Sequence, residues 1–183
     1  MRVIYYTASS LDGFIAGPGH DVDWLMALDD TGGEGYAAFI AKVGAIAMGS
    51  NTYEWVLRNH IEPEGKPRGA WPYTQPTFVF SKRELPRVEG ADLRFVRGDV
   101  SAVMPEIRAA AGGGNLWIVG GGDLAGQFWD RGLLDEIEVA VAPVMLGAGS
   151  PLLPRRIASP PLRLLETRPA GPFVIVRYAV ERG

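Results

Sequence analysis

Residues 116–137, LWIVGGGDLAGQFWDRGLLDEI, join a run typical of a buried strand to an amphipathic helix through three consecutive glycines. In an open α/β sheet, a helix that begins just beyond the end of a strand presents unpaired N–H groups and a partial positive charge. Glycine lets a phosphate approach such a backbone because no Cβ stands in the way. The junction therefore predicts either a diphosphate-binding turn or a tight turn without a ligand.

A second strand-to-helix junction lies within residues 45–58. The apolar run AIAMG ends at Gly49, and Ser50, Asn51 and Thr52 then open a helix with residue types that cap helices or bind phosphate oxygens. Ordinary N-capping explains this junction taken alone. Two such junctions on neighbouring parallel strands would bind the two ends of one diphosphate, so we expect both helices to begin side by side.

Strand and helix patterns alternate along most of the chain. Residues 99–111 have helical spacing, but Pro105 requires either a kink or a later start of the helix. Residues 10–33 and 59–76 are rich in turn-forming residues and predict loops. We count about seven strands and four helices, which predicts an α/β fold with a mostly parallel central sheet flanked by helices and an antiparallel C-terminal hairpin. The strand patterns lie at 3–9, 45–49, 77–81, 93–98, 115–119 and 136–146, and the tail has a hairpin pattern that turns at residues 169–172.

Length and composition limit the classes of protein that fit. The 183 residues, 47% of them hydrophobic, suffice for one core, so we treat 1–183 as a single domain. A formal net charge of −3 gives no basic field for nucleic acid or an anionic membrane, and neither partner is expected. The chain has no cysteine and no apolar run near the ~20 residues that span a bilayer, which fits a cytoplasmic protein. His20 and His60 lack the spacing of metal ligands, so no metal is expected.

Five short blocks occur along nearly the whole chain in an order that resembles the dihydrofolate reductase superfamily. The blocks are SLDGFIAG, MGSNTYE, FVFSKRE, WIVGGGDLAGQF and APVMLGAGSPLLP. The last block is more similar to the branch typified by the RibD C-terminal domain, the reductase domain of the bifunctional deaminase-reductase of riboflavin biosynthesis. The resemblance implies a dihydrofolate reductase-like fold with NADPH as the cofactor, bound along the ends of the central strands.

The resemblance also implies a role for individual residues. The residues implied for the cofactor are Ala8 and Ile15 at the nicotinamide, Gly49, Ser50, Asn51 and Thr52 on one side of the diphosphate, Val119, Gly120, Gly121, Gly122, Asp123 and Leu124 on the other side, and Ser81, Lys82 and Arg83 at the 2′-phosphate. The bond between Gly120 and Gly121 is implied to be cis. Asp123 would alternatively cap its helix, and residues 81–83 would alternatively form a solvated basic turn. The family commonly has Arg or Lys where this chain has Ser50, so one charged phosphate contact is lost and the preference for NADPH over NADH is weakened.

Three residues are candidates for the substrate side. Trp24 and Asp29 have the spacing of a Trp and an acidic residue in dihydrofolate reductases, which implies that Asp29 protonates or orients a ring nitrogen near Trp24. Asp12, in the turn SLDG, is a second candidate catalytic carboxylate. Each has an ordinary alternative, namely a solvent-facing Asp29, a turn-forming Asp12 and a core Trp24.

The branch implies an NADPH-dependent oxidoreductase that transfers a hydride to a small heterocyclic substrate, with 5-amino-6-(5-phosphoribosylamino)uracil as the favoured one. Dihydrofolate reductase is the alternative enzyme, although Ala140 stands where a Thr is common in that family. An NADP(H)-binding protein without turnover is the other alternative. The resemblance implies a homodimer that pairs through a sheet edge and the last strands, and the apolar run 173–180 is compatible with such an edge. The alternative is that this run pairs only within the monomer.

Overall fold

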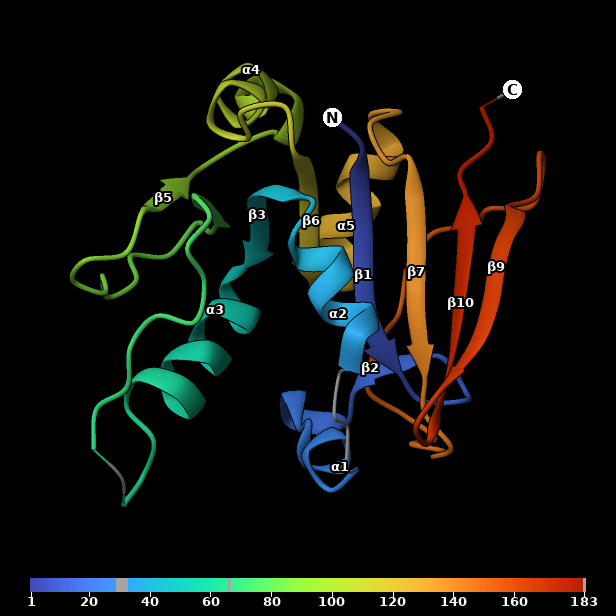
Figure 1. The fold of residues 1–183 in the computed structure, drawn as a ribbon, viewed down its shortest axis with the longest axis horizontal. Helices are drawn as coiled ribbons and strands as arrows, with labels where there is room; N and C mark the ends of the chain where they lie inside the picture. Colours follow the sequence, from blue (N-terminus) through green and yellow to red (C-terminus); the bar gives the residue numbers. More distant parts are fainter. Residues whose placement is uncertain (29–32, 66, 183) are drawn as a thin grey trace.

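The computed structural model describes residues 1–28, 33–65 and 67–182, which form an α/β fold around an eight-stranded sheet (Figure 1). The strands lie in the order β5, β4, β3, β6, β1, β7, β10, β9. Neighbours from β5 to β7 are parallel, whereas β10 is antiparallel to both β7 and β9. The predicted fold class is therefore confirmed. The strands are β1 (Val3–Ser9), β3 (Val43–Gly49), β4 (Thr77–Phe80), β5 (Leu93–Val96), β6 (Asn115–Gly120), β7 (Glu136–Val141), β9 (Arg163–Ala170) and β10 (Phe173–Ala179).

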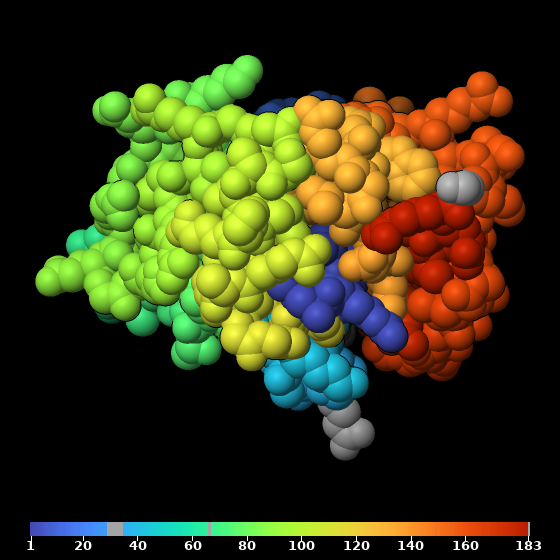
Figure 2. Space-filling view, turned by 90° about the horizontal axis from the view of Figure 1, so that it is seen from above, coloured from blue at the N-terminus to red at the C-terminus, as the bar shows by residue number. Residues whose placement is uncertain are grey.

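Helices cover both faces of the sheet, and the alternation of side chains along β3 explains why. Ala45 and Ala47 belong to the core cluster under α4 and α5, whereas Ile46 and Met48 belong to the cluster under α2 and α3. Figure 2 shows α2 (cyan) and the orange residues that follow α5 on opposite sides of the molecule. The helices are α2 (Gly33–Ile40), α3 (Ser50–Val56), α4 (Val100–Ala110) and α5 (Gly122–Asp130).

Several short elements gather beyond the carboxyl ends of the central parallel strands, at the bottom of Figure 1. The short helix α1 packs there through Trp24 and Leu25 against the buried cluster of Ala142, Phe173 and Ile175. α3 continues directly into the turn η2, so the helical stretch extends beyond Val56. These elements are β2 (Phe14–Ala16), which pairs with β8 (Ser150–Pro151), the 3-10 turn η1 (Pro18–His20), α1 (Asp23–Met26) and the π-helical turn η2 (Leu57–Ile61).

Some local expectations are wrong. Residues 10–33 contain β2 and α1 in addition to loop, because β2 is formed by pairing with β8, far away in sequence. The strand expected over 136–146 ends at Val141. The apolar run 173–180 is not a free edge, because β10 lies between β7 and β9 and buries Phe173 and Ile175. The edge strand on that side of the sheet is β9.

The helix α4 begins at Val100, so the alternative of a later start is wrong. Asp99 precedes it, and its carboxylate accepts a hydrogen bond from the Ser101 N–H at 2.8 Å, which fixes the first turn. Pro105 lies inside the helix on its exposed side. Within the described ranges, every helix is too short or too polar to cross a membrane.

Candidate functional site

The two predicted glycine junctions meet at one edge of the sheet. Gly49 is the N-cap residue of α3 and Gly121 is that of α5, and neither helix receives a side-chain cap from the described part of the chain. β3 and β6 are parallel neighbours, and a Cβ added to Gly49 would lie 3.6 Å from the Gly121 nitrogen. The bond between Gly120 and Gly121 is cis, as the resemblance implies. The expectation that both helices begin side by side is confirmed.

The glycines at these junctions differ in whether packing requires them. Gly122 is required by packing, because a Cβ there would lie 2.4 Å from the carbonyl oxygens of both Pro151 and Leu152. Gly49 has a φ of −80° and Gly121 a φ of −87°, values that any residue adopts. A Cβ on either would meet no described atom closer than 3.6 Å. Glycine at these two positions leaves the backbone open, which favours a ligand-binding turn over a merely tight one.

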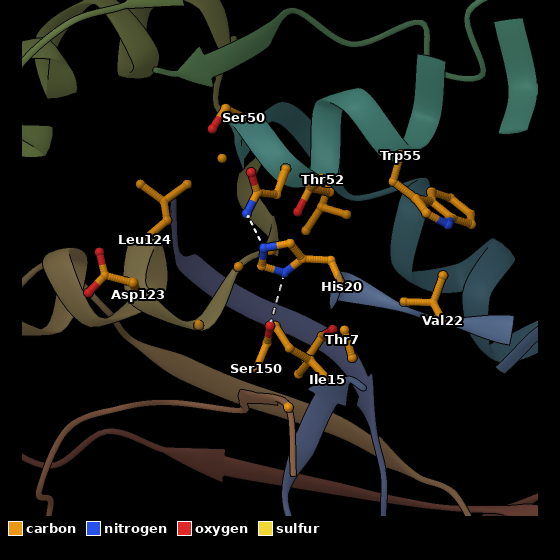
Figure 3. A pocket seen from close by; sticks show the side chains of 18 of the residues that line it. Thr7, Ile15, His20, Val22, Ser50, Thr52, Trp55, Asp123, Leu124 and Ser150 are labelled. Atoms are coloured by element: carbon orange, nitrogen blue, oxygen red, sulfur yellow. Dashed lines mark hydrogen bonds between the residues drawn. The ribbon is translucent and has the colours of Figure 1, made fainter. Parts of the chain in front are cut away.

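A cavity of about 750 Å³ lies in front of both helix starts (Figure 3). Its volume falls in the range of small-molecule sites. Ile15 and Phe80 contribute apolar surface, and the residues around the two helix starts contribute amides and hydroxyls. The predicted cofactor residues that line it are Ala8, Ile15, Gly49, Ser50, Asn51, Thr52, Val119, Gly120, Gly121, Gly122, Asp123 and Leu124.

Asp123 lines this cavity but does not cap α5, so the capping alternative is wrong. Its carboxylate lies 3.2 Å from the guanidinium of Arg155, which also binds Asp130 at 2.9 Å. Arg155 passes close over Gly126, where an added Cβ would lie 2.7 Å from the guanidinium carbon. Arg155 therefore offsets the negative charge of Asp123 and holds its own loop against α5.

The predicted 2′-phosphate residues Ser81, Lys82 and Arg83 follow β4 and do not line the cavity. The Ser81 hydroxyl closes a turn by accepting from the Arg83 N–H at 2.9 Å. The Arg83 guanidinium reaches α3 and binds both carboxylate oxygens of Glu54 at 2.9 Å and the Asn51 Oδ1 at 3.1 Å. Because Glu54 and Asn51 line the cavity, Arg83 is connected to it through them. Lys82 is exposed.

His20 is the polar residue at the centre of the cavity that sequence reasoning missed (Figure 3). Its Nε2 lies 3.0 Å from the Asn51 Nδ2, and its Nδ1 lies 3.1 Å from the Ser150 Oγ. Since an amide nitrogen only donates, Nε2 accepts from Asn51 and Nδ1 of the neutral ring donates to Ser150. The ring thereby connects the start of α3 to β8. The turn GPGH, which places His20 at a φ of 64°, was the local signal that could have marked it.

The substrate candidates lie away from the cavity or outside the described residues. Asp12 accepts hydrogen bonds from the Ser10 hydroxyl at 2.6 Å and from the Gly147 N–H at 2.7 Å, and these bonds hold the pKa of Asp12 below its usual range. Its placement agrees with the turn-forming alternative. Trp24 packs in the core cluster of Phe173, and its buried Nε1 has no hydrogen-bond partner within the described residues. Asp29 lies outside the described residues.

A second cavity of about 540 Å³ continues the first. The two share His20, Val22, Trp55 and Arg58. In Figure 3, Val22 and Trp55 lie on the opposite side of His20 from Leu124. The cleft therefore has an amide-rich end at the helix starts and a second end around Trp55. Its further lining residues, which the sequence did not point to, include Thr7, Leu25, Gln127, Ser150 and Pro154 in the larger cavity and Asp21, Asp23, Glu62 and Glu64 in the smaller one.

The sequence matches a known protein family and curated proteins along almost its whole length. The model of the RibD C-terminal domain matches residues 1–176. The chain is 29% identical over 177 residues to the uncharacterised protein YwjB of Bacillus subtilis, and the match covers 97% of each chain. The resemblance to this branch is therefore confirmed along almost the whole sequence.

Several solved structures have a similar fold. A provisionally named riboflavin biosynthesis protein from Shewanella sp. PV-4 matches with a TM-score of 0.81 and 27% identity over 100% of both chains. A deaminase/5-amino-6-(5-phosphoribosylamino)uracil reductase from Thermotoga maritima matches with a TM-score of 0.64 and 15% identity, over 97% of this chain and 56% of that one. Dihydrofolate reductase from Enterococcus faecalis, complexed with NADP(H), matches with a TM-score of 0.64 and 16% identity, over 97% and 95%. The chain thus belongs to the RibD C-terminal domain family, on a fold shared with dihydrofolate reductase.

Proposed function

We propose that this protein is an NADPH-dependent reductase that transfers a hydride to a small heterocyclic substrate, of the 5-amino-6-(5-phosphoribosylamino)uracil reductase type. The observation that carries the proposal is the open backbone at Gly49 and Gly121. Both glycines face one cavity, and neither is required there by its φ angle or by packing. Such a backbone suits the diphosphate of a dinucleotide, because two helix starts direct N–H groups at the same place.

The lining residues fit NADPH in the order that the family resemblance implies. The N–H groups at Ser50 and Asn51 would hold one side of the diphosphate, and those from Gly121 to Leu124 the other. Ala8 and Ile15 would lie against the nicotinamide. The turn of Ser81, Lys82 and Arg83, which is connected to the cavity through Glu54 and Asn51, would bind the 2′-phosphate.

The chain's own contribution to the reaction is mostly positioning. When bound, NADPH supplies the hydride, and transfer needs the reacting atoms held about 3–3.5 Å apart with water excluded. Ile15, Phe80 and Leu124 supply apolar walls that keep water away. The end of the cleft around Val22 and Trp55 would hold the substrate ring, since it lies across the cavity from Leu124. Asp29 is the proposed proton donor, whereas Asp12 is engaged by Ser10 in its own turn and by the loop at Gly147.

One observation supports the alternative of a nucleotide-binding protein without turnover. Among the described residues of the larger cavity, Glu54 and Asp123 are the carboxylates, and each is paired with an arginine. Each carboxylate is held by its arginine, so neither is free to turn toward a substrate. Turnover therefore depends on a group such as Asp29, and binding without turnover is the expected result if Asp29 does not reach the substrate.

Two measurements test the proposal. Titration with NADPH, followed by quenching of its fluorescence and by the rise in the melting temperature of the protein, tests whether the cofactor binds. Loss of NADPH absorbance is then followed with the phosphoribosylaminouracil substrate and, separately, with dihydrofolate. Oxidation with the first substrate supports the proposal, and oxidation with dihydrofolate alone supports the other enzyme. Binding without oxidation supports the nucleotide-binding alternative, and absence of binding refutes all three.

A further inference from the structure

Glu54 and Arg83 form an ion pair beside the start of α3. Two guanidinium nitrogens of Arg83 bind the two Glu54 carboxylate oxygens at 2.9 Å each, and one of these nitrogens also contacts the Asn51 Oδ1 at 3.1 Å. The Glu54 side chain is 28% exposed and the Arg83 side chain 53%, so the carboxylate is the more enclosed partner. Glu54 also lines the larger cavity. The pair therefore lies next to the binding surface rather than out in solvent.

The pair changes what Arg83 offers to an anion. A guanidinium binds carboxylates and phosphates through the same planar fork of N–H groups. In Arg83 that fork already holds Glu54. A phosphate at this place must displace the Glu54 carboxylate or share the guanidinium with it, and in either case it is repelled by the carboxylate. Toward an anionic ligand, the pair therefore acts as a nearly neutral group.

Neighbouring residues do not compensate for this neutralisation. Ser50 offers a hydroxyl at the position after Gly49 and carries no charge. Among the described residues that line the larger cavity, Arg58 is the single Arg or Lys, and it also lines the smaller cavity near Trp55. Lys82 is exposed and, like Arg83, does not line the larger cavity. Apart from Lys82, the attraction for an additional phosphate at this place therefore depends on Arg83, whose charge Glu54 offsets.

We propose that Glu54 is a specificity-determining residue that offsets the attraction of Arg83 for a 2′-phosphate, so that the protein binds NADH and NADPH with similar affinity. The inference rests on the proposed function, because it takes the larger cavity as a dinucleotide site. It adds a selectivity residue that lies on α3 rather than in the basic turn itself. Glu54→Gln tests it, since the amide keeps the length of the side chain and one acceptor oxygen for Arg83 but removes the charge.

The experiment compares dissociation constants for NADPH and NADH, measured by isothermal titration calorimetry on the full chain. For the wild-type protein we expect the two constants to agree within about threefold. Glu54→Gln is expected to tighten NADPH binding about tenfold, the size of one charge-assisted hydrogen bond, and to change NADH binding less than about twofold. Arg83→Gln is expected to act in the opposite direction, weakening NADPH relative to NADH, because it leaves Glu54 without its cation.

Glu84→Gln is the matched control. Glu84 follows Arg83 in sequence, its side chain is 93% exposed, and it lies 3.5 Å from Arg97, so the variant removes one carboxylate from the same turn without touching the pair. We expect both dissociation constants of this control to stay within about twofold of the wild type. Thermal melts show whether each variant is folded, and Arg83→Gln still provides the NADPH-to-NADH ratio if Glu54→Gln is not.

The possible outcomes are distinct. A wild-type preference for NADPH of about tenfold or more overturns the inference and leaves the proposed function intact. An NADPH-to-NADH ratio that does not change in Glu54→Gln or in Arg83→Gln overturns it as well. Failure of the wild-type protein to bind either nucleotide overturns the proposed function and, with it, the inference.

Discussion

The first turn of α4 is capped by a side chain, whereas the first turns of α3 and α5 receive no side-chain cap from the described residues. At α4, the Asp99 carboxylate accepts from the Ser101 N–H at 2.8 Å and pairs with Arg131, so the protein satisfies this first turn itself. At α3 and α5 the N-cap residues are Gly49 and Gly121, and the described residues provide no side-chain cap. A capped start adds stability, whereas an open start keeps its N–H groups for a ligand. The same kind of element thus serves folding in one place and binding in another.

Gly122→Ala tests whether packing holds the open start of α5 in place, and we expect it to have the largest effect. The added methyl group would lie 2.4 Å from the carbonyl oxygens of Pro151 and Leu152, so the loop or the helix must shift. The free energy of unfolding is expected to fall by about 3 kcal/mol, measured by urea denaturation.

Gly49→Ala is the control for this change. It introduces the same methyl group at the N-cap of α3, where the nearest described atom is 3.6 Å away. Its expected cost is less than about 1 kcal/mol, the difference between Gly and Ala as N-cap residues. Equal losses of stability in Gly49→Ala and Gly122→Ala would show that packing does not distinguish the two glycines.

Gly49→Asp transfers the capping arrangement of α4 to α3. The φ of −80° and ψ of 167° at Gly49 suit a capping carboxylate. We expect the melting temperature to stay the same or to rise, while the affinity for NADPH falls at least about tenfold, because the carboxylate occupies the first-turn N–H groups and repels phosphate. Calorimetric titration and a thermal melt measure the two effects. A folded Gly49→Asp protein that binds NADPH like the wild type would refute the role of the open start.

The effect of pH on protein stability tests the contribution of the Asp99 cap at α4, and we expect this effect to be the smallest. Hydrogen bonds from Arg131 and Ser101 hold the pKa of Asp99 well below its usual range. A carboxyl with a lower pKa in the folded state stabilises the fold above about pH 4, the unfolded value, and this contribution is lost as the pH falls toward the folded pKa. Asp99→Asn should therefore lower the melting temperature at pH 7, and the difference from the wild type should shrink by pH 3. An equal difference at both pH values would contradict this.

The parallel part of the sheet could be predicted because each strand-to-helix junction lies in consecutive residues. Gly49 and Gly121 both follow apolar runs and precede helices, so their place at the sheet edge follows from the sequence. The position of β10 could not be predicted, because its apolar pattern is the same for an edge strand and an interior strand. Its place depends on pairing with both β7 and β9. The β2–β8 pair was missed because Phe14 pairs with Pro151, far away in sequence.

The backbone part of the candidate site was easier to predict than its side-chain part. The glycines and hydroxyl residues at the helix starts form local motifs. The contacts of His20 join it to Asn51 and Ser150, residues 31 and 130 positions away, and no local pattern reports such pairs. The Glu54–Arg83 pair was missed for the same reason, since it links α3 to a turn 29 residues later.

The carbonyl oxygen of Leu152 connects the cavity to the interior of the protein. It accepts a hydrogen bond from the hydroxyl of the fully buried Tyr5 at 2.9 Å, and it also lies against Gly122. The chain around Leu152, next to the lining residue Pro151, is therefore fixed from two directions, whereas His20 in the centre of the cavity is exposed and held through two side-chain contacts. The lining near Pro151 is preorganised and the His20 side chain is adaptable, so the protein loses conformational entropy mainly at His20 when a ligand binds.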